Sequence, residues 1–162
     1  MKNDEKKKKQ LDFYRCSVCG NLIIKLNDSG IIPQCCGRDM ERLEPNSIDA
    51  STEYHVPKIM MDGNKLHVFV GNEPHPMTST HHIQWIVVKT CFGIYLKELK
   101  PEDEPMAIFK LCKDEDVQCV YCYCNLHGLW KGKCAKDDKD CKDSEDCEDS
   151  EDFEDCEDSG DC

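Results

Sequence analysis

Hydrophobic and polar residues alternate along short segments of the chain between residues 46 and 134. In Lys65–Val70 an apolar side chain recurs at every second position, which places Leu66, Val68 and Val70 on one face of an extended strand. Further short apolar segments follow at Ile83–Val88, Phe92–Leu96, Ala107–Leu111 and Val117–Tyr123. Because glycine and proline residues separate these segments, we predict that residues 46–134 form an all-β sandwich domain.

A second, smaller metal-binding domain is predicted for residues 11–45. It contains Cys16-Ser17-Val18-Cys19-Gly20 and the adjacent pair Cys35-Cys36, and the segment Leu22–Ile24 with the turn Asn27–Gly30 predicts a short hairpin between them. A unit of about 35 residues buries too little apolar surface to fold alone, so we expect a metal ion to hold it together. Four thiolates suit either iron or zinc, and a purely structural zinc knuckle is the alternative.

The two ends of the chain differ from this pattern. Residues 1–10 are a lysine-rich lead, for which we expect disorder. Residues 135–162 repeat a unit close to Glu-Asp-Cys-Glu-Asp-Ser and hold 15 acidic and 3 basic residues, which accounts for the whole net charge of −12. Too few apolar residues are present to offset the entropy of ordering, so we predict a disordered, solubilising acidic tail. Metal scavenging by the cysteines of the tail is the alternative.

Charge and cysteine content narrow the classes of partner. Residues 1–134 hold 18 acidic and 18 basic residues, so no nucleic-acid partner is expected. No secretory signal is visible, and no segment approaches the ~20 apolar residues that cross a bilayer. Fourteen cysteines, clustered in a chain without such a signal, favour metal binding over a disulfide framework. We therefore expect a cytoplasmic protein with no membrane partner.

Candidate metal ligands gather in three segments of the predicted sandwich. Cys124 and His127 are three residues apart, so one short turn presents a thiolate and an imidazole to the same ion. His75 and His81 flank a proline-containing turn, and His55 lies further upstream. Zinc sites close at about four ligands, so four imidazoles with one thiolate favour redox iron with one coordination position left open.

These segments resemble the ligand motifs of the superoxide reductase family. The motifs are Glu-x-His-Val-Pro at Glu53–Pro57, a His-Pro-Met segment that continues through a second His to Ile-Gln-Trp at His75–Trp85, and Cys-Asn-x-His-Gly-x-Trp at Cys124–Trp130. The adjacent pair Cys35-Cys36 makes the N-terminal unit similar to the desulforedoxin-like domain of the two-iron branch, called desulfoferrodoxin. The resemblance covers residues 11–134.

The resemblance implies an immunoglobulin-like β-sandwich and two irons per chain. The first iron would be bound by the four thiolates of Cys16, Cys19, Cys35 and Cys36. The catalytic iron would have a plane of four imidazoles and an axial thiolate, supplied by His55, His75, His81, His127 and Cys124.

Glu53 and Tyr54 are the further candidate residues of the catalytic site. The resemblance implies that the Glu53 carboxylate closes on the ferric ion after turnover. The family has a lysine at the position of Tyr54, so this chain lacks a positive charge that normally lies near the open coordination position.

A chain of this family is expected to reduce superoxide to hydrogen peroxide by one electron, and a rubredoxin-like external donor is expected to re-reduce its iron. The resemblance also implies a homodimer. Two alternative functions are an iron-based electron carrier without an open site and a zinc-binding or metal-storage protein. We expect His67, His82 and the Cys119–Cys122 pair to lie outside the metal sites. Residues three apart in a strand face opposite sides, which argues against a shared ion for that pair.

Overall fold

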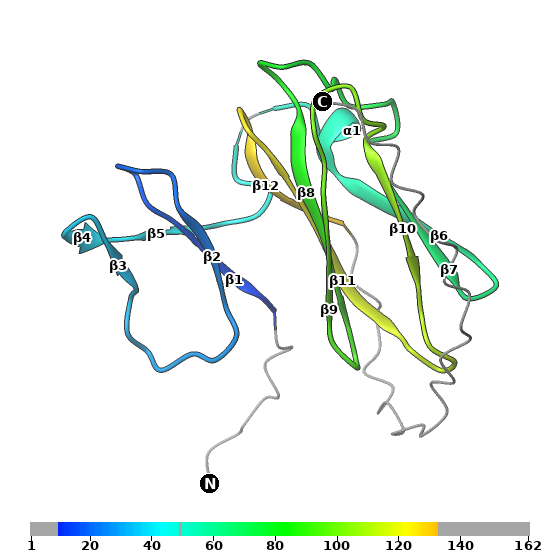
Figure 1. The fold of residues 1–162 in the computed structure, drawn as a ribbon, viewed down its shortest axis with the longest axis horizontal. Helices are drawn as coiled ribbons and strands as arrows, with labels where there is room; N and C mark the ends of the chain where they lie inside the picture. Colours follow the sequence, from blue (N-terminus) through cyan, green and yellow to red (C-terminus); the bar gives the residue numbers. More distant parts are fainter. Residues whose placement is uncertain (1–9, 49, 133–162) are drawn as a thin grey trace, which may run out of the picture.

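The computed structural model describes residues 10–48 and 50–132. Figure 1 shows these residues as two parts, a small N-terminal unit in colours from blue to cyan and a larger sandwich of strands in colours from turquoise to yellow. Within the described ranges no helix is long and apolar enough to cross a membrane. Apart from Gln10, the predicted lysine-rich lead and the predicted acidic tail lie outside the described residues.

Seven antiparallel strands form the two sheets of the larger part. One sheet has the order β10-β7-β6, with the bounds Met106–Lys110, Lys65–Val70 and Pro57–Asp62. The other has the order β12-β11-β8-β9, with the bounds Gly128–Lys131, Val117–Cys124, Ile83–Thr90 and Ile94–Glu98. The all-β fold class predicted from the hydrophobic pattern is thereby confirmed.

The core of the sandwich lies between the inner faces of these two sheets. On β7 the alternating residues Leu66, Val68 and Val70 are at most 2% exposed, as their spacing predicts. Val120 and Cys124 of β11 belong to the same buried cluster. Fully burying an aliphatic side chain of this size contributes about 1.5–3 kcal/mol, so this layer decides which face of each strand points inward.

Short strands form the N-terminal unit. Its main sheet has the order β2-β1-β5, with the bounds Leu22–Lys25, Asp12–Arg15 and Glu41–Leu43. The two-residue strands β3 and β4 form a separate pair, with the bounds Gln34–Cys35 and Arg38–Asp39.

The hairpin predicted from Leu22–Ile24 and the turn Asn27–Gly30 is wrong, although Leu22–Ile24 does lie in a strand of a different hairpin. Strand β2 pairs with β1, which precedes it, and not with residues beyond the turn at 27–30. The loop of the hairpin is the Cys16–Gly20 knuckle, because the Cys16 amide donates to the Asn21 carbonyl oxygen at 2.8 Å. The knuckle that presents two of the thiols is therefore also the turn of this unit.

Aromatic side chains attach the N-terminal unit to the outer face of the four-stranded sheet. Phe13 of β1 stacks on Trp85 of β8 with ring centroids 5.4 Å apart, and it contacts Tyr121 of β11 at 5.0 Å. Phe13 is buried, and the Leu11 amide donates to the Tyr121 hydroxyl oxygen. The unit therefore shares a buried cluster with the sandwich in addition to a small core of its own.

Strand β6 and the helical turn α1 were not predicted from the sequence. Strand β6 lies at the edge of its sheet, and five of its six side chains are exposed, so it lacks the alternation of a half-buried strand. Helix α1 is a single turn, Thr52–His55, which immediately precedes β6. The helical turn matters for function because it carries His55, the first candidate metal ligand.

Candidate metal centres

Five donor side chains meet where connections from both sheets come together. Their ligand atoms all lie within 4.8 Å of one another, and they belong to His55, His75, His81, Cys124 and His127. Helix α1 carries the first of these residues, the β7–β8 connection carries the next two, and the end of β11 and the turn that follows it carry the last two. The structure thus brings together the five residues that the sequence motifs single out for the catalytic metal.

The four imidazole rings of this cluster form a square. Neighbouring rings have centroids 4.7–4.9 Å apart and are inclined by 74–87° to one another. Across the square, the rings of His55 and His81 are 6.3 Å apart, close to the diagonal of a square with that side. His55 Nε2 and His127 Nδ1 are 2.8 Å apart. Two adjacent nitrogens bound at about 2.1 Å to one ion lie about 3 Å apart, so this spacing fits a metal with ligands in one plane.

Hydrogen bonds to backbone carbonyls set the tautomer of two rings. His55 Nδ1 donates to the Ser51 carbonyl oxygen at 2.7 Å, and His75 Nδ1 donates to the Pro76 carbonyl oxygen at 2.6 Å. Each Nε2 therefore keeps its lone pair for a metal ion. Burial lowers the pKa of His55 and lowers the pKa of His75 to about 4. Both rings are consequently neutral, and able to act as ligands, at neutral pH.

The turn between β11 and β12 presents Cys124 and His127 together. Gly128 closes this turn with a φ of +71°, a left-handed conformation that glycine adopts without strain. Burial raises the pKa of the Cys124 thiol, and the amides of His127 and Leu126 oppose this shift by hydrogen bonding to the sulfur. A coordinating thiol loses its proton when a cation binds beside it, so these amides are placed to stabilise the resulting thiolate.

Asn125 ties this turn to the loop that carries His81. Its side-chain oxygen accepts a hydrogen bond from the His82 amide at 2.9 Å, and its side-chain nitrogen donates to the Thr80 carbonyl oxygen at 2.9 Å. The Asn125 amide also donates to the His82 carbonyl oxygen at 3.2 Å. Three bonds therefore fix the relative position of two ligand segments that are distant in the sequence. His82 takes part through its backbone, and its ring lies outside the donor cluster.

The donor set fits a metal ion. Nε2 of His75 and Nε2 of His81 are buried and have no hydrogen-bond partner among the described residues. A buried polar atom without a partner is costly, and binding of a cation between the rings would satisfy both nitrogens. Five donors exceed the four of a closed zinc site. Imidazole and thiolate together suit a transition metal such as iron.

A second cluster lies in the N-terminal unit. It consists of four thiols whose sulfur atoms lie within 4.8 Å of one another, those of Cys16, Cys19, Cys35 and Cys36. The sulfurs of Cys19 and Cys35 are 3.5 Å apart, and those of Cys35 and Cys36 are 3.9 Å apart. Sulfurs bound tetrahedrally at about 2.3 Å to one ion lie about 3.8 Å apart, so the spacing fits a single four-coordinate metal.

The electrostatics of this second cluster also favour a bound cation. The amides of Cys19 and Val18 hydrogen bond to the sulfur of Cys16 and lower its pKa to about 6. Hydrogen bonding with the neighbouring thiols raises the pKa of Cys36 to about 12, and the largest contribution comes from Cys19. Four sulfurs this close can therefore all be thiolates only when a metal ion compensates their charge.

Glu53 and Tyr54 lie on α1 directly before His55, and both side chains are exposed. The Glu53 carboxylate is not part of the five-donor cluster. Backbone contacts hold this turn in place, since the Asn72 amide donates to the Glu53 carbonyl oxygen at 2.6 Å and the Gly71 amide donates to the Val56 carbonyl oxygen at 3.2 Å. The turn is thus anchored to the end of β7, and its two candidate side chains remain at the surface.

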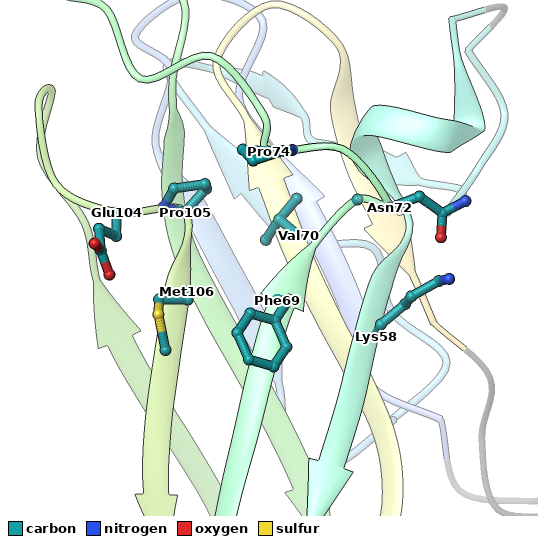
Figure 2. A pocket seen from close by; sticks show the side chains of 9 residues that line it. Lys58, Phe69, Val70, Asn72, Pro74, Glu104, Pro105 and Met106 are labelled. Atoms are coloured by element: carbon teal, nitrogen blue, oxygen red, sulfur yellow. The ribbon is translucent and has the colours of Figure 1, made fainter.

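A pocket of about 600 Å³ opens on the outer face of the three-stranded sheet, next to this anchor. Figure 2 shows Lys58 near one end of the pocket and Glu104 near the other, with Phe69 and Met106 between them. None of the five donors lines the pocket, so it is separate from the metal centre. Its wall nevertheless includes Pro74, the residue before a candidate ligand.

Three residues that contact His55 were not identified from the sequence. The Ser51 carbonyl oxygen accepts a hydrogen bond from Nδ1–H of His55, and the Trp130 ring stacks on the His55 ring with centroids 4.6 Å apart. The Cys122 thiol donates to the His55 carbonyl oxygen at 3.3 Å. The Trp130 ring nitrogen also donates to the His127 carbonyl oxygen at 3.0 Å. Trp130 belongs to a recognised motif and could have been found from it. The other two contacts depend on tertiary packing and leave no signal in the sequence.

Two separate clusters of potential metal ligands, one on a β-sandwich and one on a small N-terminal unit, define a protein with two candidate metal centres. Comparison with known proteins gives the class. The desulfoferrodoxin family model matches residues 47–133, and the model of the desulfoferrodoxin N-terminal domain matches residues 8–43.

Individual relatives agree with these family matches. The chain is 40% identical to a desulfoferrodoxin homolog of Archaeoglobus fulgidus over 121 residues, which cover 75% of this chain and 95% of the relative. It is 43% identical to a desulfoferrodoxin homolog of Methanothermobacter thermautotrophicus over 118 residues, which cover 73% of this chain and 94% of the relative. The crystal structure of the superoxide reductase from Treponema pallidum superposes with a TM-score of 0.67 at 34% identity, and covers 77% of this chain and 100% of that one.

The chain belongs to the desulfoferrodoxin family, with the N-terminal desulforedoxin-like domain and the superoxide reductase domain of that family. It is a superoxide reductase, and a cluster of four histidines and one cysteine is present in its sandwich domain.

Proposed function

We propose that the five-donor cluster holds iron and reduces superoxide to hydrogen peroxide there. The observation that supports this most strongly is the square of four imidazoles joined by one thiol, with all five donor atoms within 4.8 Å. In balanced form, one superoxide anion takes up one electron and two protons and gives one hydrogen peroxide. When bound, iron supplies the electron, and the thiolate of Cys124 assists by adding electron density.

The residues of this chain prepare the site for that chemistry. Burial keeps His55 and His75 neutral, and their Nδ1–H groups are occupied by backbone carbonyls, so their Nε2 atoms stay available as ligands. The amides of Leu126 and His127 stabilise negative charge on the Cys124 sulfur. The protein thus supplies fixed ligands and a fixed charge distribution before substrate arrives.

Glu53 and Tyr54 are proposed to act on the solvent side of the catalytic centre. Their exposure, and their place on the turn that ends in His55, support this assignment. The Glu53 carboxylate would close on the centre after turnover, and the Tyr54 hydroxyl would hold a water molecule that supplies a proton. Because Tyr54 stands where the family has a lysine, this proposal includes no positive charge at that position for the approaching anion.

The four-cysteine cluster is proposed to hold a second iron, which stabilises the N-terminal unit. Thiolate spacing suited to one tetrahedral ion supports this proposal. Reduction of superoxide leaves the catalytic centre oxidised, so an external one-electron donor is required, and we propose a small carrier of the rubredoxin type. Both clusters need cysteines in the thiolate state, which is consistent with the reducing cytoplasm as the site of action.

Two chains are proposed to associate through the outer face of the three-stranded sheet. Apolar side chains are exposed on this face, with Met60 53%, Ile108 54% and Phe69 37% accessible. They are neighbours across the sheet, since Met60 and Ile108 both pair with the residue at position 67 on β7. Lys58 and Glu104 lie at opposite ends of the adjoining pocket, so two copies related by a two-fold axis can match opposite charges. Sedimentation equilibrium tests this association: Met60→Glu with Ile108→Glu should give monomers, and an unchanged dimer would exclude this face.

Metal content and reaction with superoxide test the central proposal. Purified protein should contain two irons per chain, and the anaerobically reduced protein should be oxidised rapidly by a pulse of superoxide, with one hydrogen peroxide formed per superoxide and no oxygen released. An electron carrier without an open site would show no such rapid reaction. Zinc in place of iron at both clusters would support a metal-storage function and would exclude the proposed reaction.

A further inference from the structure

His55 is held more extensively than its role as one of four imidazole ligands requires. Its Nδ1–H is bonded to the Ser51 carbonyl oxygen, and its ring lies on the indole of Trp130 with an interplanar angle of 23°. A third contact acts on its backbone: the thiol of Cys122 donates to the His55 carbonyl oxygen at 3.3 Å. Cys122 is a member of neither metal cluster, and the proposed reaction assigns it no part.

Cys122 is placed by the same strand that presents the Cys124 ligand. The two residues are two positions apart on β11, so both side chains face the core between the sheets. Across the strand pair, Cys122 lies directly opposite Trp130 of β12. One cross-strand pair therefore contacts His55 twice, at the ring through Trp130 and at the backbone through Cys122.

The environment of Cys122 suits a hydrogen-bond donor and not a metal ligand or a reactive thiol. Its side chain is fully buried, with 0% exposure. A neutral thiol has one weak donor, and here that donor is directed at an oxygen atom of another structural element. The contact joins the four-stranded sheet to the helical turn α1 that precedes the three-stranded sheet.

We propose that Cys122 is a positioning residue for the His55 ligand: its S–H group holds the His55 carbonyl and thereby fixes the end of α1 against strand β11. Residues that orient metal ligands commonly change metal affinity by 10–100-fold when they are removed. Because a thiol is a weak donor, we expect an effect at the lower end of that range. This inference rests on the proposed function only in taking His55 as a ligand.

Cys122→Ala and Cys122→Ser make a matched pair of variants. Both side chains are smaller than cysteine and nearly equal to each other in volume, so they leave the same void, but serine keeps a donor and alanine does not. Val120→Ala is a second control, because Val120 is fully buried on the same face of β11. It creates a cavity in the same core without removing a hydrogen bond to a ligand residue.

The measurement uses full-length protein from which all metal has been removed. Zinc is first loaded into the four-cysteine centre, and cobalt(II) is then added as the probe of the five-donor centre. Cobalt affinity and the thiolate-to-cobalt absorption are recorded for each variant, with thermal unfolding in parallel. We expect Cys122→Ala to weaken cobalt binding about tenfold and to shift the absorption. Cys122→Ser should bind cobalt within about twofold of the parent chain, and Val120→Ala should lower the unfolding temperature with an unchanged cobalt spectrum.

Equal cobalt affinities for Cys122→Ala and Cys122→Ser would overturn the inference, because the donor would then make no difference. A lower unfolding temperature for Cys122→Ala with an unchanged spectrum and affinity would also overturn it, since Cys122 would then only fill space. Should Cys122→Ala not fold, the decision passes to Cys122→Ser, whose spectrum must match that of the parent chain. Failure of the parent chain itself to bind cobalt through His55 would be a failure of the proposed metal site, and is distinguishable from both results.

Discussion

Gly71 lies where the backbone of α1, which carries His55, packs against the loop that leads to His75. Replacing Gly71 with alanine should therefore disrupt the five-donor centre. Gly71 has a φ of +88°, and a Cβ atom there would lie 2.4 Å from the Glu73 carbonyl oxygen and 2.7 Å from the Tyr54 carbonyl oxygen. Both obstacles are backbone atoms, so no change of side-chain rotamer can relieve the overlap. The chain must instead move α1 away from the loop that follows β7.

The size of the effect follows from two contributions. A left-handed conformation costs an alanine about 1–2 kcal/mol, and forcing extra atoms into a packed region costs about 1–3 kcal/mol more. If the loop moves to relieve the overlap, part of this cost appears as weaker metal binding. A loss of about 2 kcal/mol corresponds to roughly a 30-fold weaker affinity.

Gly63 provides the matched control. It has a φ of +58° and no atom within 4 Å of the position a Cβ would take, so Gly63→Ala carries the conformational cost without the overlap. The six residues of β7 separate its turn from Gly71, which places it about 20 Å away. Gly63→Ala should therefore lower stability by about 1–2 kcal/mol and leave both metal centres intact.

Metal analysis, visible spectra and denaturant unfolding of the two variants make the comparison. Gly71→Ala should bind metal at the five-donor centre roughly 30-fold more weakly, with a correspondingly weaker absorption, and should retain the absorption of the four-cysteine centre, because only the former depends on the contact between α1 and the loop. Equal unfolding free energies for the two variants, with both centres retained, would refute this account of how the ligand segments are held.

Three further predictions concern the ligands, the substrate and the tail. Cys124→Ser should remove the thiolate-to-metal absorption of the catalytic centre and leave the four-cysteine spectrum unchanged, since the two clusters share no residue; loss of both spectra from a folded protein would contradict this. Tyr54→Lys should speed the second-order reaction with pulsed superoxide by up to about tenfold at low ionic strength, with the gain shrinking as salt is added; identical rates and salt slopes would show that another cation already supplies the field. A chain ending at Cys134 should keep both metals and react at the parent rate, because the family match ends at residue 133; loss of one metal would identify tail cysteines as ligands.

Four of the five candidate ligands of the catalytic centre form two pairs, and each pair could be found from the sequence because it lies on one short, local segment. Cys124 and His127 are three residues apart on a turn, and His75 and His81 flank another. Local spacing of this kind can be recognised in a sequence without knowledge of the fold. It cannot, however, show that the three segments meet, and only the resemblance to a family supplied that step.

Elements whose position depends on neighbouring structure were predicted less well. The strand expected at Phe92–Leu96 is observed at Ile94–Glu98, because Phe92 and Gly93 belong to the turn, where the Thr90 amide donates to the Gly93 carbonyl oxygen at 3.0 Å. The linear pattern marks the Cys16–Gly20 knuckle only as a metal-binding loop, but this knuckle also closes the β1–β2 hairpin. In both places the residues form a turn between two strands, and the order of residue types along the chain does not indicate that turn.

Local preferences and burial agree along most of the sandwich, but they conflict at the five-donor cluster. His55 and His75 are 4% and 2% exposed, and the Nε2 atoms of His75 and His81 have no hydrogen-bond partner among the described residues. Burying unsatisfied polar atoms opposes folding, so this end of the sandwich should be less stable without metal than the apolar core between the sheets. The donors come from connections of both sheets, so a bound ion would join the layers at that end and offset the cost. Metal binding and folding of this region are then thermodynamically linked, and removal of the catalytic metal should increase hydrogen exchange first at α1 and the β7–β8 connection, before the strands β8 and β11 are affected.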